Sequence, residues 1–521
     1  MKTTTLLICV LLSVASAAPK FIDWSWSSPS LDFLEQNLEH MKAECPFLDG
    51  IVIKVTGKPI EKDGKKWNPV TGNAWGRTPW QFEMFDETIA RFKKLDFGNF
   101  TDNFFYMTTT YADFEWDSDD DFAVVAANFG VAAKVARAIG MKGLGVDIEE
   151  YGKKYWNFSN HKTDKTYDEY CEIVFRRGQQ WGRAVFAEYP DIVLLMPFCI
   201  SSEFLELAIP FMNGIIDVMP PTAIIFEGHE ASGYIAKIPS DYKEMQLFIR
   251  RLVRQKVRPE NISKATGQIR LAPAFYMDAY FNDAEEKNWY IRQLEPERSA
   301  LGPVRLLSRN LAAAALQADP YIWIYGEQAC WWKNSPHPRA KRTWNEMPKA
   351  EGICKAMASI KNPLADMDVT RATNLLNDPT FQGKDSKWSL WQRENDQKKP
   401  APGDGTAQDG RCVMHNVSSG CFNQSLPVKG STMYLFYCKG GVNDVRGGKA
   451  SASLCFQDAT RKWLYHDGNI QLPIPTTGKP EPVWTFVITP PRAAYISVQC
   501  GVKGQSEGGE AFFTEILLEE L

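Results

Sequence analysis

Three carboxylic acids stand close together directly after an apolar segment of the sequence. The segment reads GLGVDIEEY over residues 143–151, so Asp147, Glu149 and Glu150 follow small and aliphatic residues that are typical of a buried strand. A carboxylic acid can donate a proton, and a carboxylate can act as a base or a nucleophile. The first expectation is therefore a site whose chemistry is carried by carboxyl groups.

Alternation along the strand separates these three acids. If the apolar side chains at the even positions 144–148 pack outward, Asp147 and Glu149 share the inward face with two glycines. Glu150 then falls on the other face or in the following loop. Asp147 and Glu149 are thus the stronger catalytic candidates.

Acids and aromatic residues also close other apolar segments. In YIWIYGEQACWW (321–332), alternation places Glu327 at the end of a row of inward aromatic side chains. Asp278 closes a row that begins with small residues at 272 and 274, and it is the fourth catalytic candidate. The residues expected to bind substrate near the strand ends are Asp23, Trp24, Trp26, Tyr276, Glu227, Trp323, Tyr325 and Trp331.

A repeated pattern of strands and helices would bring these strand ends together. Between residues 21 and 360, eight apolar segments with strand character alternate with amphipathic helical segments, of which 121–140 is the longest. Eight such units in this length are typical of an α/β fold of the (β/α)8 TIM-barrel type, which we expect over residues 19–365. Active sites of such barrels lie at the carboxyl ends of the strands, where the acids stand.

Several carboxylates at one barrel mouth, with aromatic residues beside them, suit the cleavage of glycosidic bonds. One acid protonates the leaving oxygen, and a second carboxylate acts as the nucleophile or as a base for water. Aromatic rings near the strand ends can stack on the apolar faces of sugar rings. The alternative is structural, because such acids can also cap helices or pair with arginines.

The acidic segment resembles a motif of known enzymes. GLGVDIEEY is similar to the fourth-strand motif of the chitinase-like families of (β/α)8 glycoside hydrolases, Asp-Gly-x-Asp-x-Asp-x-Glu. Gly143, Asp147 and Glu149 match this motif, whereas Lys142 and Gly145 stand in place of its two earlier aspartates. The resemblance implies that Glu149 is the proton donor and that Asp147 orients and electrostatically supports it.

Two mechanisms compete for the partner of Glu149. In the first, Glu327 or Asp278 supplies a nucleophile at ~5 to 5.5 Å or a base for water at ~6.5 to 9.5 Å. In the second, Asp147 supports a neighbouring acetamido group of the substrate, and the enzyme needs no nucleophile. We favour Glu327, because its strand alternation is the clearest.

The carboxyl-terminal third has a different pattern. From about residue 366 to 521, short alternating runs are separated by clusters of Gly, Pro and Asn, which predicts an all-β sandwich. Its first and last strands resemble those of jelly-roll modules that accompany secreted glycosidases. The resemblance implies carbohydrate binding, while a role in packing against the barrel is equally compatible with the fold.

The amino terminus predicts export. Residues 1–18 combine an early lysine, an apolar run and a small-residue cleavage pattern, as in a signal peptide. We therefore expect a secreted or periplasmic protein with no membrane span. In such a compartment disulfides can form, but buried free thiols are the simpler expectation for Cys45, Cys171, Cys199, Cys330 and Cys354.

Charge and motif content limit the classes of partner and cofactor that we expect. The net charge of -4 gives no basic excess, so nucleic-acid binding is not expected. The histidines lack metal-ligand spacing, and no phosphate-binding glycine loop is present, so we expect neither a metal nor another cofactor. The expected partner is a carbohydrate substrate, and the sequence leaves the oligomeric state open. An exported glycosidase is favoured over a sugar-binding protein without catalysis, and over a polysaccharide lyase or a hydrolase of a non-sugar substrate.

Overall fold

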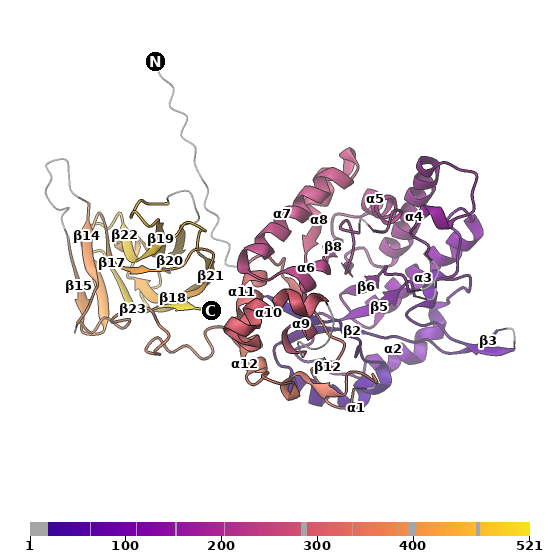
Figure 1. Ribbon diagram of the computed structural model, residues 1–521, viewed down its shortest axis with the longest axis horizontal. Coiled ribbons are helices and arrows are strands. Elements are labelled where there is room, and N and C mark those ends of the chain that lie inside the picture. The colour runs from indigo at the N-terminus through magenta and orange to yellow at the C-terminus, as the bar shows by residue number, and fades with distance from the viewer. Residues whose placement is uncertain are drawn as a thin grey trace, which may run out of the picture. The chain divides into compact units, whose positions relative to one another are not determined.

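The computed structural model describes residues 19–521 apart from 63, 111, 152–153, 203, 283–288, 336, 384, 394–402 and 465–468 (Figure 1). The predicted signal peptide, residues 1–18, lies outside the described residues. The chain divides into two compact units, Ala18–Pro363 and Leu364–Leu521.

The first unit is built on a parallel sheet of nine strands. Its strands are β1 (Lys20–Asp23), β2 (Leu48–Ile53), β5 (Phe104–Thr108), β6 (Gly143–Asp147), β7 (Val193–Met196), β8 (Ile224–Glu227), β9 (Ile269–Leu271), β10 (Ala274–Tyr276) and β11 (Tyr321–Tyr325). Their order in the sheet is β10-β11-β1-β2-β5-β6-β7-β8-β9. The sheet is curled like a half-barrel, and its carboxyl strand ends carry the acids considered above.

The two edge strands of this sheet are neighbours in the chain. Only Ala272 and Pro273 separate β9 from β10. The Ala272 N–H donates to Glu227 O on β8 at 2.9 Å, and the Trp323 N–H on β11 donates to Pro273 O at 3.1 Å. The link 272–273 is therefore hydrogen-bonded to β8, near one end of the sheet, and to β11, near the other end.

Helices connect the strands and surround the sheet in Figure 1. They are α1 (Leu31–Glu44), α2 (Asp86–Phe92), α3 (Asp119–Ala138), α4 (Tyr167–Glu188), α5 (Ala208–Val218), α6 (Ala231–Ile235), α7 (Pro239–Lys256), α8 (Ile262–Gln268), α9 (Asp278–Phe281), α10 (Trp289–Leu301), α11 (Pro303–Ala315) and α12 (Ile353–Lys361). The long helix predicted at 121–140 begins two residues earlier, because Ser118 caps it by accepting from the Asp121 N–H. Two small two-stranded sheets complete the unit, β3 (Ile60–Lys62) with β4 (Lys65–Trp67) and β12 (Ala329–Cys330) with β13 (Arg342–Thr343).

The inside of the curled sheet is filled by side chains from alternate strand positions. Tyr321 and Trp323 lie in this inner core, as the alternation of the sequence predicts. Gly145 on β6 makes room for Trp24, since a Cβ at Gly145 would lie 3.4 Å from the Trp24 ring. Aromatic residues therefore form the part of the inner core that lies at the carboxyl ends of the strands.

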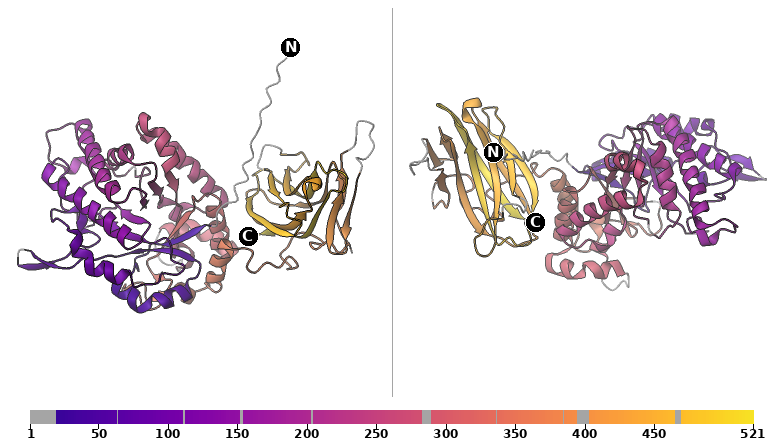
Figure 2. Two further views of the ribbon diagram at one scale, coloured as in Figure 1. Left: turned by 180° about the vertical axis from the view of Figure 1, so that it is seen from behind. Right: turned by 90° about the horizontal axis from the view of Figure 1, so that it is seen from above.

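The second unit consists of two antiparallel sheets (Figure 2). One has the order β14-β17-β22-β19-β20, made of β14 (Ser389–Gln392), β17 (Ser419–Pro427), β22 (Tyr495–Lys503), β19 (Lys449–Gln457) and β20 (Ile470–Pro473). The other has the order β15-β16-β23-β18-β21, made of β15 (Asp404–Gln408), β16 (Arg411–His415), β23 (Glu510–Glu520), β18 (Met433–Val442) and β21 (Glu481–Ile488). Apolar residues from both sheets share one core, so the predicted β-sandwich is confirmed.

Two further findings concern the whole described chain. No helix in the described residues is long and apolar enough to cross a membrane. The ten cysteines of the described part are all free thiols, and Cys45, Cys199 and Cys330 are buried while Cys171 and Cys354 are partly exposed.

The compactness of the second unit leads to a prediction about folding. A fragment of residues 364–521 has its own two-sheet core and should fold without the first unit. We expect a cooperative urea transition monitored by circular dichroism, with slowly exchanging amide hydrogens in β17, β18, β19 and β22. A matched fragment of residues 19–363 serves as the comparison. A 364–521 fragment without a cooperative transition would show that the sandwich depends on the first unit.

Candidate active site

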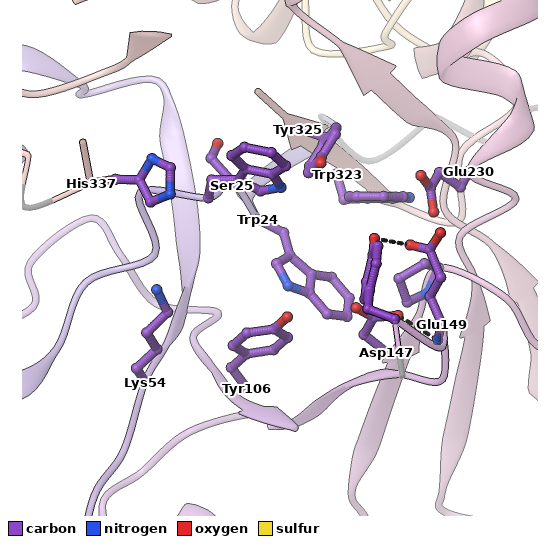
Figure 3. A pocket seen from close by; sticks show the side chains of 13 residues that line it. Trp24, Ser25, Lys54, Tyr106, Asp147, Glu149, Glu230, Trp323, Tyr325 and His337 are labelled. Atoms are coloured by element: carbon purple, nitrogen blue, oxygen red, sulfur yellow. Dashed lines mark hydrogen bonds between the residues drawn. The ribbon is translucent and has the colours of Figure 1, made fainter. Parts of the chain in front are cut away.

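A cavity of about 370 Å³ opens at the carboxyl ends of the parallel strands (Figure 3). Three acids, several aromatic rings and two basic residues form its wall. The lining residues are Trp24, Ser25, Trp26, Lys54, Tyr106, Asp147, Glu149, Tyr151, Pro197, Glu230, Trp323, Tyr325 and His337. Figure 3 shows Lys54 and His337 on one side of the cavity and the three acids on the other.

Asp147 and Glu149 stand at the end of β6 and are joined by a hydrogen bond. The Glu149 N–H donates to Asp147 Oδ1 at 2.9 Å. The Thr109 hydroxyl donates to the Glu149 carbonyl at 2.8 Å, which fixes the backbone of the loop. The Tyr151 hydroxyl donates to the Glu149 carboxylate. Both predicted acids therefore line one cavity, with Glu149 held from its backbone and its side chain.

Burial raises the pKa of Asp147 to about 7. Loss of hydration is the main cause, and the nearby charge of Glu149 adds to it. Hydrogen bonds from the Glu149 N–H and from Tyr106 oppose the shift. Near neutral pH the Asp147 carboxyl therefore still holds a proton for much of the time.

Glu230 is the third acid of the cavity, and the sequence analysis missed it. It lies three residues beyond the end of β8, and the Tyr234 hydroxyl donates to its Oε1 atom. Burial raises the pKa of Glu230 to about 8, with further contributions from the charges of Glu149 and Asp147. The only signal in the sequence was a second acid in the segment EGHE (227–230), because strand alternation does not extend into the loop.

Glu227, predicted to bind substrate, has a different role. Its side chain is fully buried and does not line the cavity. Its carboxylate accepts hydrogen bonds from the backbone N–H groups of Cys199, Ile200, Ser201 and His229 and from the Ser201 hydroxyl, at 2.8 to 3.1 Å. Glu227 thus fixes the loop after β7 and the turn that leads to Glu230.

Asp278 likewise accepts hydrogen bonds from backbone N–H groups. It is fully buried at the start of α9, and its two oxygens accept from the Glu327 and Gln328 N–H groups at 2.8 and 3.0 Å. The structure does not bring the Asp278 side chain to the cavity wall. It fixes the loop after β11 and so positions Glu327.

Glu327 lies close to the cavity but outside its lining. It is partly exposed, and the Tyr325 hydroxyl donates to its Oε1 atom at 3.1 Å. Its charge contributes to the raised pKa of Glu230, so the two carboxyl groups are electrostatically coupled. Glu327 is therefore close to the cavity acids but is not part of the cavity wall.

The predicted substrate-binding residues fall into two groups. Trp24, Trp26, Trp323 and Tyr325 line the cavity. Asp23, Glu227, Tyr276 and Trp331 do not line it. Asp23 is buried and accepts from the Ser25 hydroxyl at 2.6 Å, Tyr276 stacks on Tyr325 at 5.1 Å between ring centroids, and Trp331 packs edge-on against Phe47 at 4.9 Å.

The hydrogen-bond donors separate two kinds of acid at this end of the sheet. Each cavity acid is paired with a tyrosine: Asp147 with Tyr106, Glu149 with Tyr151 and Glu230 with Tyr234. Three acids outside the wall, Glu150, Glu227 and Asp278, are held by two or more backbone N–H groups, whereas Glu327, also outside it, is paired with Tyr325. The first group can exchange protons with a ligand, whereas the second maintains the loops. No cluster of three or more metal-ligating side chains occurs among the described residues.

Comparisons with known proteins give only distant likenesses. No protein-family model and no curated protein sequence matches the chain. Three solved structures illustrate the matches found. The enzymatically active domain of tailspike protein 4 from bacteriophage CBA120 is 16% identical over 29% of this chain and 22% of its own, with a TM-score of 0.24. A family 4 carbohydrate-binding module is 12% identical over 28% of this chain and 99% of its own, with a TM-score of 0.22. The arabinose-bound MgGH51 α-L-arabinofuranosidase is 11% identical over 30% of this chain and 27% of its own, with a TM-score of 0.22.

The raised pKa of Asp147 predicts how stability changes with pH. Because the pKa is about 7 in the folded protein against an ordinary 3.8, the folded state binds this proton more tightly than the unfolded state. The stabilisation is complete below pH 4 and is lost as the pH rises through 7. Asp147→Asn has no such loss. When the pH is raised from 4 to 8, the free energy of unfolding of the variant relative to that of wild type should therefore increase by at least about 1 kcal/mol.

Urea denaturation at pH 4 and pH 8 measures this difference. Asp164→Asn is the matched control, because the Asp164 side chain is 99% exposed. Parallel pH dependence of wild type and Asp147→Asn would contradict the shifted pKa.

Proposed function

We propose that the chain is an exported glycoside hydrolase and that Glu149 is its proton donor. The observation that carries the proposal is the convergence of Asp147, Glu149 and Glu230 on one aromatic-walled cavity at the strand ends. Export rests on the signal-peptide pattern of residues 1–18. We also propose that the curled sheet is a closed (β/α)8 barrel whose seventh strand is divided into β9 and β10, a reading supported by the hydrogen bonds of Ala272 and Trp323.

The acids supply the proton that bond cleavage needs. Charges on neighbouring carboxyl groups disfavour ionisation of one another, so protons belong to the group of acids as a whole. Asp147 and Glu230 both have pKa values raised to 7 or above, and the charge of Glu149 contributes to both shifts. The acids therefore retain at least one proton near neutral pH. Glu149, held by Tyr151 at the cavity wall, donates it to the leaving glycosidic oxygen.

The aromatic side chains hold the sugar against these acids. Trp24 and Trp323 lie 5.6 Å apart between ring centroids, and Tyr106 lies 5.7 Å from Trp24. Their rings offer apolar surface to the C–H faces of a sugar and exclude water from the acids. Exclusion of water strengthens the electrostatic interactions that act on the developing positive charge of the sugar.

We infer that Asp147, rather than Glu327, is the functional partner of Glu149. Asp147 lines the cavity and accepts from the Glu149 N–H, whereas Glu327 is outside the lining. In this mechanism the 2-acetamido group of the substrate attacks the anomeric carbon, and Asp147 orients that group and stabilises the positive charge that develops on it. The substrate would then be a glycan with N-acetylated amino sugars.

The proton donor is tested by Glu149→Gln. Glutamine keeps the shape of the side chain but carries no transferable proton, so turnover of an unactivated glycan should fall by about 10² to 10⁴-fold. Reducing-end release measures turnover. The matched control is Glu150→Gln, whose remaining carbonyl oxygen can still accept from the Trp156 N–H. Near-normal turnover by Glu149→Gln would remove Glu149 from its role.

The partner is tested by alanine variants with added azide. Azide replaces a missing enzyme nucleophile, so it restores activity only when the deleted carboxylate had attacked the sugar. We expect Asp147→Ala to lose at least about 10²-fold in activity without rescue by azide, and Glu327→Ala to retain most of its activity. Rescue of Glu230→Ala or Glu327→Ala by azide would instead identify an enzyme nucleophile and contradict the role given to Asp147.

A further inference from the structure

A second cleft, of about 850 Å³, lies on one sheet of the carboxyl-terminal unit. It crosses β14, β17, β22, β19 and β20. Alternate residues of these strands, such as Phe422, Cys500 and Ala452, point into the shared core. The residues between them form the opposite face of the sheet, which carries the cleft.

Strand register orders the residues of this face. One row across all five strands is Trp391, Cys421, Gly501, Ser451 and Pro473, and the next row is Ser389, Asn423, Gln499, Ser453 and Gln471. All of these residues line the cleft except Ser389 and Asn423. Apart from Trp391, Cys421 and Pro473, these side chains are small or are hydroxyl and amide groups. Such a surface offers many hydrogen-bond donors and acceptors without net charge.

The glycine at the centre of this face is not required by packing. A Cβ at Gly501 would meet no atom closer than 3.4 Å, which is ordinary contact. Glycine inside a strand costs stability, and it is often found where another group approaches the backbone closely. Gly501 leaves a trough between Cys421 and Ser451, its cross-strand neighbours.

An aromatic ring stands at the edge of this trough. Trp391 on β14 is 54% exposed, although tryptophan is ordinarily a well-buried residue. It pairs with Cys421 on β17, and Cys421 pairs with Gly501 on β22, so one strand separates Trp391 from Gly501 in the same row. An indole face beside a line of hydroxyl and amide groups suits a sugar ring, which has an apolar C–H face and a rim of hydroxyl groups.

Two lysines mark one end of the cleft. Lys449 and Lys503 are exposed and stand directly opposite each other on β19 and β22. Like charges in this position repel, and neither lysine takes part in an ion pair among the described residues. The described residues that line the cleft include no carboxylate. An anionic group on a ligand would relieve this repulsion.

We propose that this cleft binds an oligosaccharide that carries a carboxylate or sulfate on the sugar next to Lys449 and Lys503. Its uncharged sugars would lie over Gly501, with one ring stacked on Trp391, and its hydroxyl groups would bond to Ser451, Gln471 and Gln499. The site is separate from the cavity with Glu149 and does not depend on the activity proposed for it.

Calorimetric titration of the full chain tests this proposal. The probes are oligogalacturonate and a sulfated galactan oligosaccharide, each compared with uncharged galactan oligosaccharides of the same length. We expect an anionic probe to bind at least about tenfold more tightly than its neutral counterpart at low salt, and this preference to shrink with added salt. The two anionic probes distinguish a carboxylate ligand from a sulfate ligand.

Variants assign the binding to the cleft. Trp391→Ala should weaken binding of the preferred probe at least tenfold, and Gly501→Ala should weaken it without lowering the melting temperature. Lys449→Gln with Lys503→Gln should abolish the preference for the anionic probe. Matched controls are Leu390→Ala on the same strand and Lys429→Gln with Lys462→Gln, two exposed lysines outside the cleft. Absence of binding by every probe, or binding that Trp391→Ala leaves unchanged, would overturn the proposal.

Discussion

Loss of hydration around carboxyl groups at the ends of the parallel strands is the constraint on which the candidate site depends. An ionised carboxylate loses much favourable interaction with water when protein surrounds it, so it must find donors or keep its proton. The protein uses both solutions within a few residues of one another. Burial raises the pKa of all four acids, but Glu227 and Asp278 bind the backbone N–H groups of loops, whereas Asp147 and Glu230 receive tyrosine hydroxyls at the cavity wall.

This division links the fold to the proposed chemistry. The loops after β7 and β11 would be free to move without the buried carboxylates that bind their N–H groups. With these loops fixed, Tyr325, Pro197 and Glu230 surround a single cavity. The acids that bind the loop N–H groups therefore help to shape the site, although they do not line the cavity.

Much of this arrangement could be predicted from the sequence, and the physical reasons for the remainder are clear. Strand alternation correctly placed Asp147, Trp323 and Tyr325 at the cavity, because a period of two is dictated by the backbone. It could not separate Glu227 from Glu230, because their surroundings depend on loop N–H groups contributed by the segment after β7. The sandwich was predictable from its short alternating runs, but the cleft required the cross-strand register that brings Trp391, Gly501 and Ser451 into one row.

The central claim is that water cleaves a glycosidic bond at the cavity that holds Glu149. It is tested most directly by incubating the purified chain with a panel of glycans in water enriched in heavy oxygen and analysing the products by mass spectrometry. The account predicts new reducing ends that carry one heavy oxygen atom from the solvent, with N-acetylated glycans cleaved preferentially. Unlabelled, unsaturated products that absorb ultraviolet light, or binding of a glycan without any cleavage, would contradict it.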